Sequence, residues 1–219
     1  MRVRDYLGIS ETRQRQLTWV MQVCLVGIVF IGFDRRGGGI ILNAVIGLAV
    51  VQLPPLLERD YDVQMDAGLT LWITSAVFLH AVGTVGVPGG AGGFYQTTWW
   101  WDHLTHALSS SVVAGVGYAT ARALDEHSDA VSLPEEFVFV FLLMFVLAFG
   151  VAWEVIEFST STVATALGGS PVMTQYGLTD TMLDLVFDAV GAIVVAVWGT
   201  AHLTTLTTQI SDRLASLPE

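Results

Sequence analysis

Residues 137–164 read FVFVFLLMFVLAFGVAWEVIEFSTSTVA, and this stretch decides the fold of the chain. Its first half carries no charged side chain, and the whole exceeds the roughly 20 residues that a helix needs to cross a hydrocarbon core of about 30 Å. Glu154 and Glu157 nevertheless lie inside it, three residues apart and so on one face of a helix. The stretch therefore predicts a transmembrane helix that buries two carboxylates.

Five further stretches are apolar and long enough to cross a bilayer. The chain has 219 residues and a mean hydropathy of +0.62, and 13% of its residues are charged, about half the fraction in ordinary soluble domains. We therefore predict an all-α, polytopic transmembrane helix bundle in the lipid bilayer, with a single domain over residues 1–219. The net charge of −11 argues against nucleic acid as a partner. The six predicted spans lie near 17–33, 38–57, 67–87, 103–123, 137–164 and 181–203.

Arginines in the short flanks of the spans predict the orientation of the chain. All nine cationic residues are Arg, and with a cytoplasmic N-terminus only Arg35 and Arg36 lie on the outer side. We therefore expect a multi-pass protein of the cell membrane with both termini in the cytoplasm. An acidic chain without Lys is also typical of salt-adapted proteins, so a halophilic source is a further expectation.

Polar residues that lipid would reject recur on four of the predicted spans. Two histidines three residues apart share one face of the fourth span, and aspartates four residues apart share one face of the sixth. At 1.5 Å per residue these side chains come to lie about 5–11 Å below the outer ends of their spans, so we expect them to meet in one layer. Outside 137–164 this cluster consists of His80, Asp102, His103, His106, Asp180, Asp184 and Asp188.

Several carboxylates in one layer of a membrane repel one another unless they are protonated or share a cation. We expect all seven residues of the cluster to be ligands of a divalent metal ion. Zn, Mn or Fe suits histidines beside carboxylates, whereas carboxylates alone suit Mg or Ca. Structural alternatives remain for three residues: Asp102 and Asp180 can cap helix N-termini, and His80 can be an ordinary hydrogen-bonded residue of the bundle.

The order of these motifs resembles that of a known family. The motifs are His80, Trp-Asp-His-Leu-Thr-His at 101–106, Glu154-x-x-Glu157, and Thr-Gln-Tyr-Gly-Leu-Thr-Asp-x-x-x-Asp-x-x-x-Asp-x-x-Gly at 174–191. Over about residues 70–195 the chain resembles the YjdF-like family of predicted inner-membrane proteins with a domain of unknown function. Members of that family tend to have Gln-Gly-Asp where this chain reads Tyr-Gly-Leu-Thr-Asp at 176–180. A lesser likeness to VanZ-like proteins rests on three shared features: a helix with Asp and His, a helix with Glu, and a late helix with Asp. Neither resemblance implies an established reaction.

Three functions are compatible with the cluster. In the first, the chain is a metal-dependent hydrolase or phosphotransferase for a lipid-linked substrate, with Glu154 or Glu157 as the catalytic general base. Arg35 and Arg36 would then bind the phosphate headgroup of that substrate. In the second, the chain is a transporter of a cation or of protons, for which buried carboxylates and histidines are the usual material. In the third, the protein is non-catalytic and its protonated carboxylates connect the helices.

Overall fold

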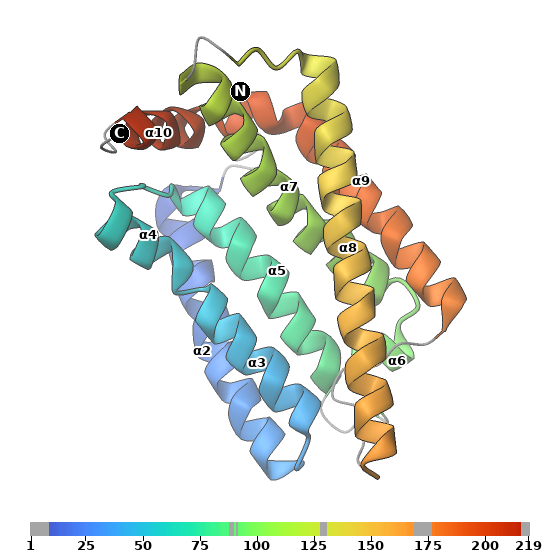
Figure 1. The fold of residues 1–219 in the computed structure, drawn as a ribbon. Helices are drawn as coiled ribbons and strands as arrows, with labels where there is room; N and C mark the ends of the chain where they lie inside the picture. Colours follow the sequence, from blue (N-terminus) through green and yellow to red (C-terminus); the bar gives the residue numbers. More distant parts are fainter. Residues whose placement is uncertain (1–8, 88–89, 91, 128–130, 169–176, 216–219) are drawn as a thin grey trace.

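The computed structural model describes residues 9–87, 90, 92–127, 131–168 and 177–215. Over these residues every regular element is an α-helix, so the predicted all-α fold is confirmed. Figure 1 shows the helices coloured along the chain: α2 (Glu11–Asp34), α3 (Gly38–Val50), α4 (Leu53–Tyr61), α5 (Ala67–Val85), α6 (Phe94–Thr97), α7 (Trp101–His127), α8 (Glu135–Ala166), α9 (Leu178–His202) and α10 (Thr204–Ala215).

Local signals in the sequence set where the helices begin and end. Asp66 caps α5 by accepting a hydrogen bond from the Leu69 backbone N–H at 2.8 Å. The prolines at 54–55 lie in the first turn of α4, where a missing N–H is tolerated, so the predicted span 38–57 divides into α3 and α4. α5 ends before Gly86, whose φ of +68° is a conformation that favours glycine.

Five helical segments of the described chain are long and apolar enough to cross a membrane. Their outer surfaces are apolar: Phe30, Met144 and Trp198 are 68%, 62% and 59% exposed. Extended apolar surface of this kind suits contact with lipid and not with water. The five segments are Glu11–Asp34, Gly38–Tyr61, Ala67–Val85, Glu135–Ala166 and Leu178–Gly199.

The fourth predicted span, 103–123, forms most of α7, yet α7 is not among these five segments. Its sequence is rich in Ser, Thr, Ala and Gly, and its position in the bundle explains why. α7 packs against α5, α8, α9 and α10, and Ser110, Ser111 and Ala114 on it are buried. A helix enclosed by protein does not need the hydrophobicity of a lipid-facing one, and its small residues allow close packing.

Figure 1 shows α7 between two groups of helices. α2, α3 and α5 pack on one another, whereas α8 packs on α7 and α9. α7 and α9 cross closely at Gly191. A Cβ at this position would overlap the Ser110 hydroxyl and the Ala107 carbonyl of α7. We call one end of the bundle the site end: it holds the α2–α3 turn, the end of α5, α6, and the beginnings of α7 and α9. α10 lies across the opposite end.

Candidate metal centre

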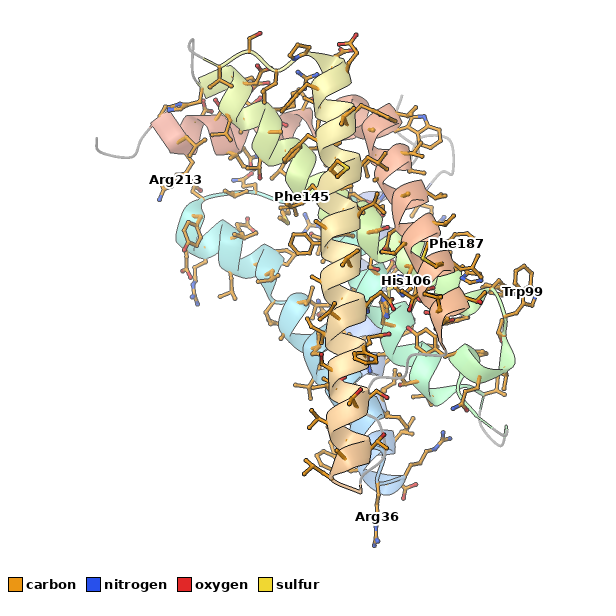
Figure 2. All side chains as sticks on the ribbon, turned by 45° about the vertical axis from the view of Figure 1, so that its right-hand side comes forward. Arg36, Trp99, His106, Phe145, Phe187 and Arg213 are labelled. Carbon is orange, nitrogen blue, oxygen red and sulfur yellow. The ribbon has the colours of Figure 1, made fainter. Side chains whose placement is uncertain are left out.

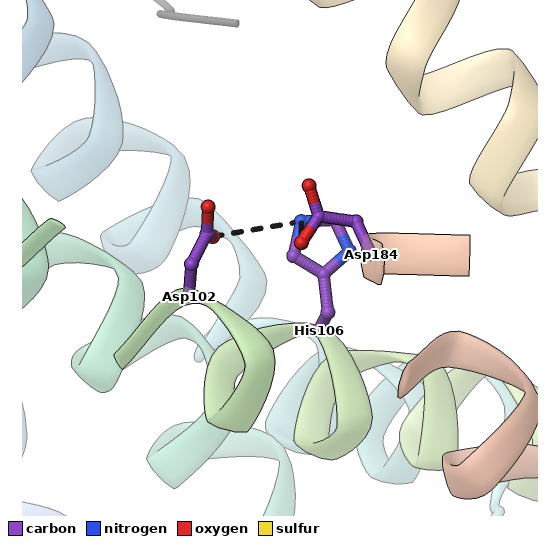
Figure 3. A group of neighbouring side chains, drawn as sticks. All are labelled: Asp102, His106 and Asp184. Atoms are coloured by element: carbon purple, nitrogen blue, oxygen red, sulfur yellow. Dashed lines mark ion pairs between the residues drawn. The ribbon is translucent and has the colours of Figure 1, made fainter. Parts of the chain in front are cut away.

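Two helices supply the centre of the site, which Figure 3 shows in close-up. Asp102 and His106 lie one turn apart at the beginning of α7, and Asp184 lies in the second turn of α9. His106 Nε2 is 3.7 Å from Asp102 Oδ1 and 3.9 Å from Asp184 Oδ1. One ligand atom from each of the three residues lies within 4.8 Å of the other two, so the group could hold a metal ion.

The second ring nitrogen of His106 is held by Asp188, one turn further along α9. His106 Nδ1 lies 3.2 Å from Asp188 Oδ1, and both side chains are buried. Because the Asp188 carboxylate accepts the hydrogen bond, Nδ1 carries a proton and Nε2 is the ring nitrogen that faces Asp102 and Asp184. A histidine oriented in this way by a carboxylate is the usual arrangement behind a metal ligand.

His103 lies at the edge of this group. Its ring stacks on Phe187 at a centroid distance of 4.5 Å, and its Nδ1 is 3.7 Å from Asp184 Oδ1. Both of these atoms are buried and have no hydrogen-bond partner among the described residues. Asp184 is only 2% exposed, and a buried carboxylate oxygen without a partner is costly. A cation near Asp184 Oδ1 would remove that cost.

The two glutamates of α8 have different surroundings although they are three residues apart. Glu154 is buried, and its Oε2 accepts a hydrogen bond from the Thr181 hydroxyl of α9 at 2.7 Å. Glu157 instead lines a cavity of about 330 Å³ that Asp102 and His106 also line. Glu154 therefore connects α8 to α9, and Glu157 is the glutamate that can meet a ligand beside the metal group.

Both ring nitrogens of His80 are occupied by other side chains. Ser109 Oγ donates to the Thr105 carbonyl at 2.7 Å and therefore accepts from His80 Nε2–H at 3.4 Å. His80 Nδ1 then accepts from the Tyr95 hydroxyl at 2.7 Å. Both contacts fit the structural alternative for His80, and its role as a metal ligand stays a prediction. Tyr95 lines the cavity, and sequence reasoning missed this contact because nothing in the spacing of the short helix α6 points to it.

Asp180, Arg35 and Arg36 lie outside the group of three. Asp180 is half-buried one turn before Asp184, and the N-cap position of α9 is Gly177, so Asp180 does not cap that helix. Asp102 lies inside α7, in its first turn. Arg35 lines the cavity and donates to the Val85 carbonyl at 3.1 Å. Arg36 is exposed and does not line it, and Figure 2 shows its side chain pointing away from His106.

Fold and site together define a multi-pass α-helical membrane protein that buries an acid–histidine group near one end of its bundle. The chain belongs to the family described as predicted membrane protein DUF2238, which it matches over residues 16–205. It is also similar to an uncharacterised protein of Thermotoga maritima, with 34% identity over 143 residues that cover 65% of this chain and 67% of that protein. No solved structure matches the chain. The resemblances to YjdF-like and VanZ-like proteins stay predictions.

Proposed function

We propose that this chain is a membrane hydrolase or phosphotransferase that binds a divalent cation through Asp102, His106 and Asp184 and acts on a lipid-linked substrate. The observation that carries the proposal is the orientation of His106: Asp188 holds its Nδ1, and its Nε2 faces two carboxylates. Buried acid–histidine groups of this kind are expensive in a membrane and are therefore expected to have a function.

The ligand atoms of the group lie somewhat further apart than those around a bound metal ion. Ligand atoms around an ion with bonds of about 2.1 Å lie roughly 3.0–3.5 Å apart. The distances from His106 Nε2 to the two carboxylates, 3.7 and 3.9 Å, exceed this by a few tenths of an ångström. Small side-chain rotations would close the difference. One imidazole with two carboxylates suits Zn, Mn or Fe better than Mg or Ca, which prefer oxygen ligands alone.

The residues that line the cavity indicate which reaction the site could catalyse. A bound divalent ion would supply Lewis-acid activation of water or of a phosphoryl oxygen. Glu157 lines the same cavity as Asp102 and His106 and is half-buried, which suits a general base. Glu154 already accepts a hydrogen bond from Thr181, so we assign it to positioning α8 against α9.

Transport of a cation or of protons is the second candidate, and the buried carboxylates favour it. A conducting path would also need polar groups through the other half of the bundle. Beyond Ser111, the buried face of α7 carries Ala114, Gly115, Gly117, Tyr118, Ala119, Ala121 and Ala123. This face of α7 offers little to a travelling ion, and for that reason we favour catalysis.

Elemental mass spectrometry of the protein purified without chelator tests the metal site. We expect about one equivalent of one divalent metal in the wild type, and its loss in Asp184→Asn. Asp180→Asn, one turn away on the same helix, is the matched control and should keep the metal. Wild-type protein that stays free of metal after dialysis against Zn, Mn and Fe would refute the proposal and leave proton transport and the non-catalytic role of the carboxylates.

A further inference from the structure

The cavity of about 330 Å³ is lined by two chemically different sets of residues. Asp102 and His106 belong to the metal group, and Glu157 lines the cavity with them. Arg35 at the α2–α3 turn and Asn43 of α3 supply a guanidinium and an amide. A ligand that fills the cavity therefore meets both a cationic, hydrogen-bonding pair and the candidate metal group.

The guanidinium of Arg35 is held in place by a backbone contact. Its Nη1 donates to the Val85 carbonyl at the end of α5, 3.1 Å away. Asn43 Nδ2 donates to the Gly39 carbonyl of its own helix at 3.0 Å. The side chains are thus oriented before a ligand arrives. Arginine binds phosphate oxygens through paired, charge-assisted hydrogen bonds, so this part of the lining suits a phosphate group.

Residues from helices that do not pack extensively on each other line the cavity. Asn43 of α3 and Trp153 of α8 both line it, yet α8 packs on α7 and α9 and has no extensive contact with α3 among the described residues. Ile46 and Phe149, each one turn from these lining residues, are apolar and 41% and 53% exposed. A lipid that approached the cavity between α3 and α8 would therefore pass apolar, exposed side chains.

The volume limits what can bind inside. A cavity of about 330 Å³ is at the lower end of the range for small-molecule sites, roughly 300–1,000 Å³. It holds a phosphate headgroup but not two acyl chains, which would stay in the bilayer beside Ile46 and Phe149. Resting on the proposed function, we infer that the cavity takes a phosphate-bearing lipid headgroup that arrives sideways between α3 and α8 and is bound by Arg35 and Asn43.

Calorimetric titration of the full chain in detergent tests the headgroup. The probes are short-chain phosphatidic acid, the matching diacylglycerol and inorganic phosphate. We expect phosphatidic acid to bind and diacylglycerol not to bind. Arg35→Gln should weaken the binding of phosphatidic acid about ten- to hundredfold, as the loss of a charge-assisted hydrogen bond does. Arg36→Gln is the matched control and should bind like the wild type. Equal behaviour of the two variants would overturn the assignment, and so would inorganic phosphate that binds as tightly as phosphatidic acid.

The lateral route is tested with two neighbouring residues of α3. Ile46 lies one turn from Asn43 on the same face, whereas Val45 is exposed on a different face. In nanodiscs, Ile46→Trp should slow the association of chain-labelled phosphatidic acid several-fold, and Val45→Trp should not. Inorganic phosphate should bind equally to both variants in detergent. Unchanged association in Ile46→Trp would refute the lateral route.

Metal-free protein separates this inference from the proposed function. If chelator-treated protein still distinguishes Arg35→Gln from Arg36→Gln, the lipid site stands whatever the metal does. If the metal binds but Arg35→Gln and Arg36→Gln titrate alike, the metal centre stands and the lipid site fails.

Discussion

Replacing Gly150 of α8 by Ala is expected to disturb the metal centre without changing any polar group. An ideal Cβ at this position would overlap the Asp188 carboxylate and lie 2.9 Å from Leu185 Cδ2. Asp188 is 4% exposed and holds His106 Nδ1, so it has little room to move. The added methyl group should therefore push Asp188 away from His106.

Two opposing terms set the magnitude. Gly to Ala in a helix interior normally stabilises by up to about 1 kcal/mol. Loss of a buried hydrogen bond to a charged group costs roughly 1.5–3 kcal/mol. We expect Gly150→Ala to lower the free energy of unfolding by about 0.5–3 kcal/mol. Losing the partner of a ligating histidine should also weaken metal affinity about 10- to 100-fold.

Gly27→Ala in α2 is the matched control, because a Cβ there has nothing within 4 Å. It should be neutral or stabilising by up to about 1 kcal/mol, with unchanged metal affinity. Unfolding of the metal-free proteins in detergent and metal competition against a chelator measure the two effects. If Gly150→Ala behaves like Gly27→Ala in both assays, the assigned role of Asp188 is wrong.

Three further substitutions separate positioning from binding. Asp188→Asn keeps the shape of the side chain but removes its charge, and should weaken metal affinity about 10- to 100-fold in the chelator competition; an affinity equal to that of the wild type would contradict this. Thr181→Val removes the hydrogen bond to Glu154 and should destabilise by about 1 kcal/mol in detergent unfolding, with normal metal content. Tyr95→Phe leaves His80 Nδ1 without its donor and should destabilise by about 1–3 kcal/mol. Loss of metal in Tyr95→Phe would show that His80 belongs to the metal site after all.

Helical spacing and depth were enough to predict that the fourth and sixth spans meet through their polar faces. Asp184 and His106 do lie together, because side chains four residues apart share a face and both helices begin at the same end of the bundle. Spacing could not assign the roles within the cluster. Glu154 and Glu157 lie on one broad face, yet the rotation of α8 directs one toward Thr181 and the other into the cavity.

Amino-acid composition and spacing also could not predict where individual helices and side chains lie in the bundle. The position of α7 inside the bundle explains why its apolar content falls below that of the other spans, and only the packing reveals it. Arg35 and Arg36 are equivalent in sequence, but the α2–α3 turn gives Arg36 a φ of +52° and leaves Arg35 on the cavity. Tyr95 lies outside every predicted span, so its hydrogen bond to His80 depends on a fold that spacing cannot supply.

X-ray absorption spectroscopy of the zinc-loaded protein tests the central claim most directly. The predicted first shell contains one imidazole and carboxylate oxygens at about 2.0–2.2 Å. The imidazole contribution should vanish in His106→Gln and persist in His80→Gln. A shell of water oxygens alone, or a spectrum that His106→Gln leaves unchanged, would contradict a metal centre at Asp102, His106 and Asp184.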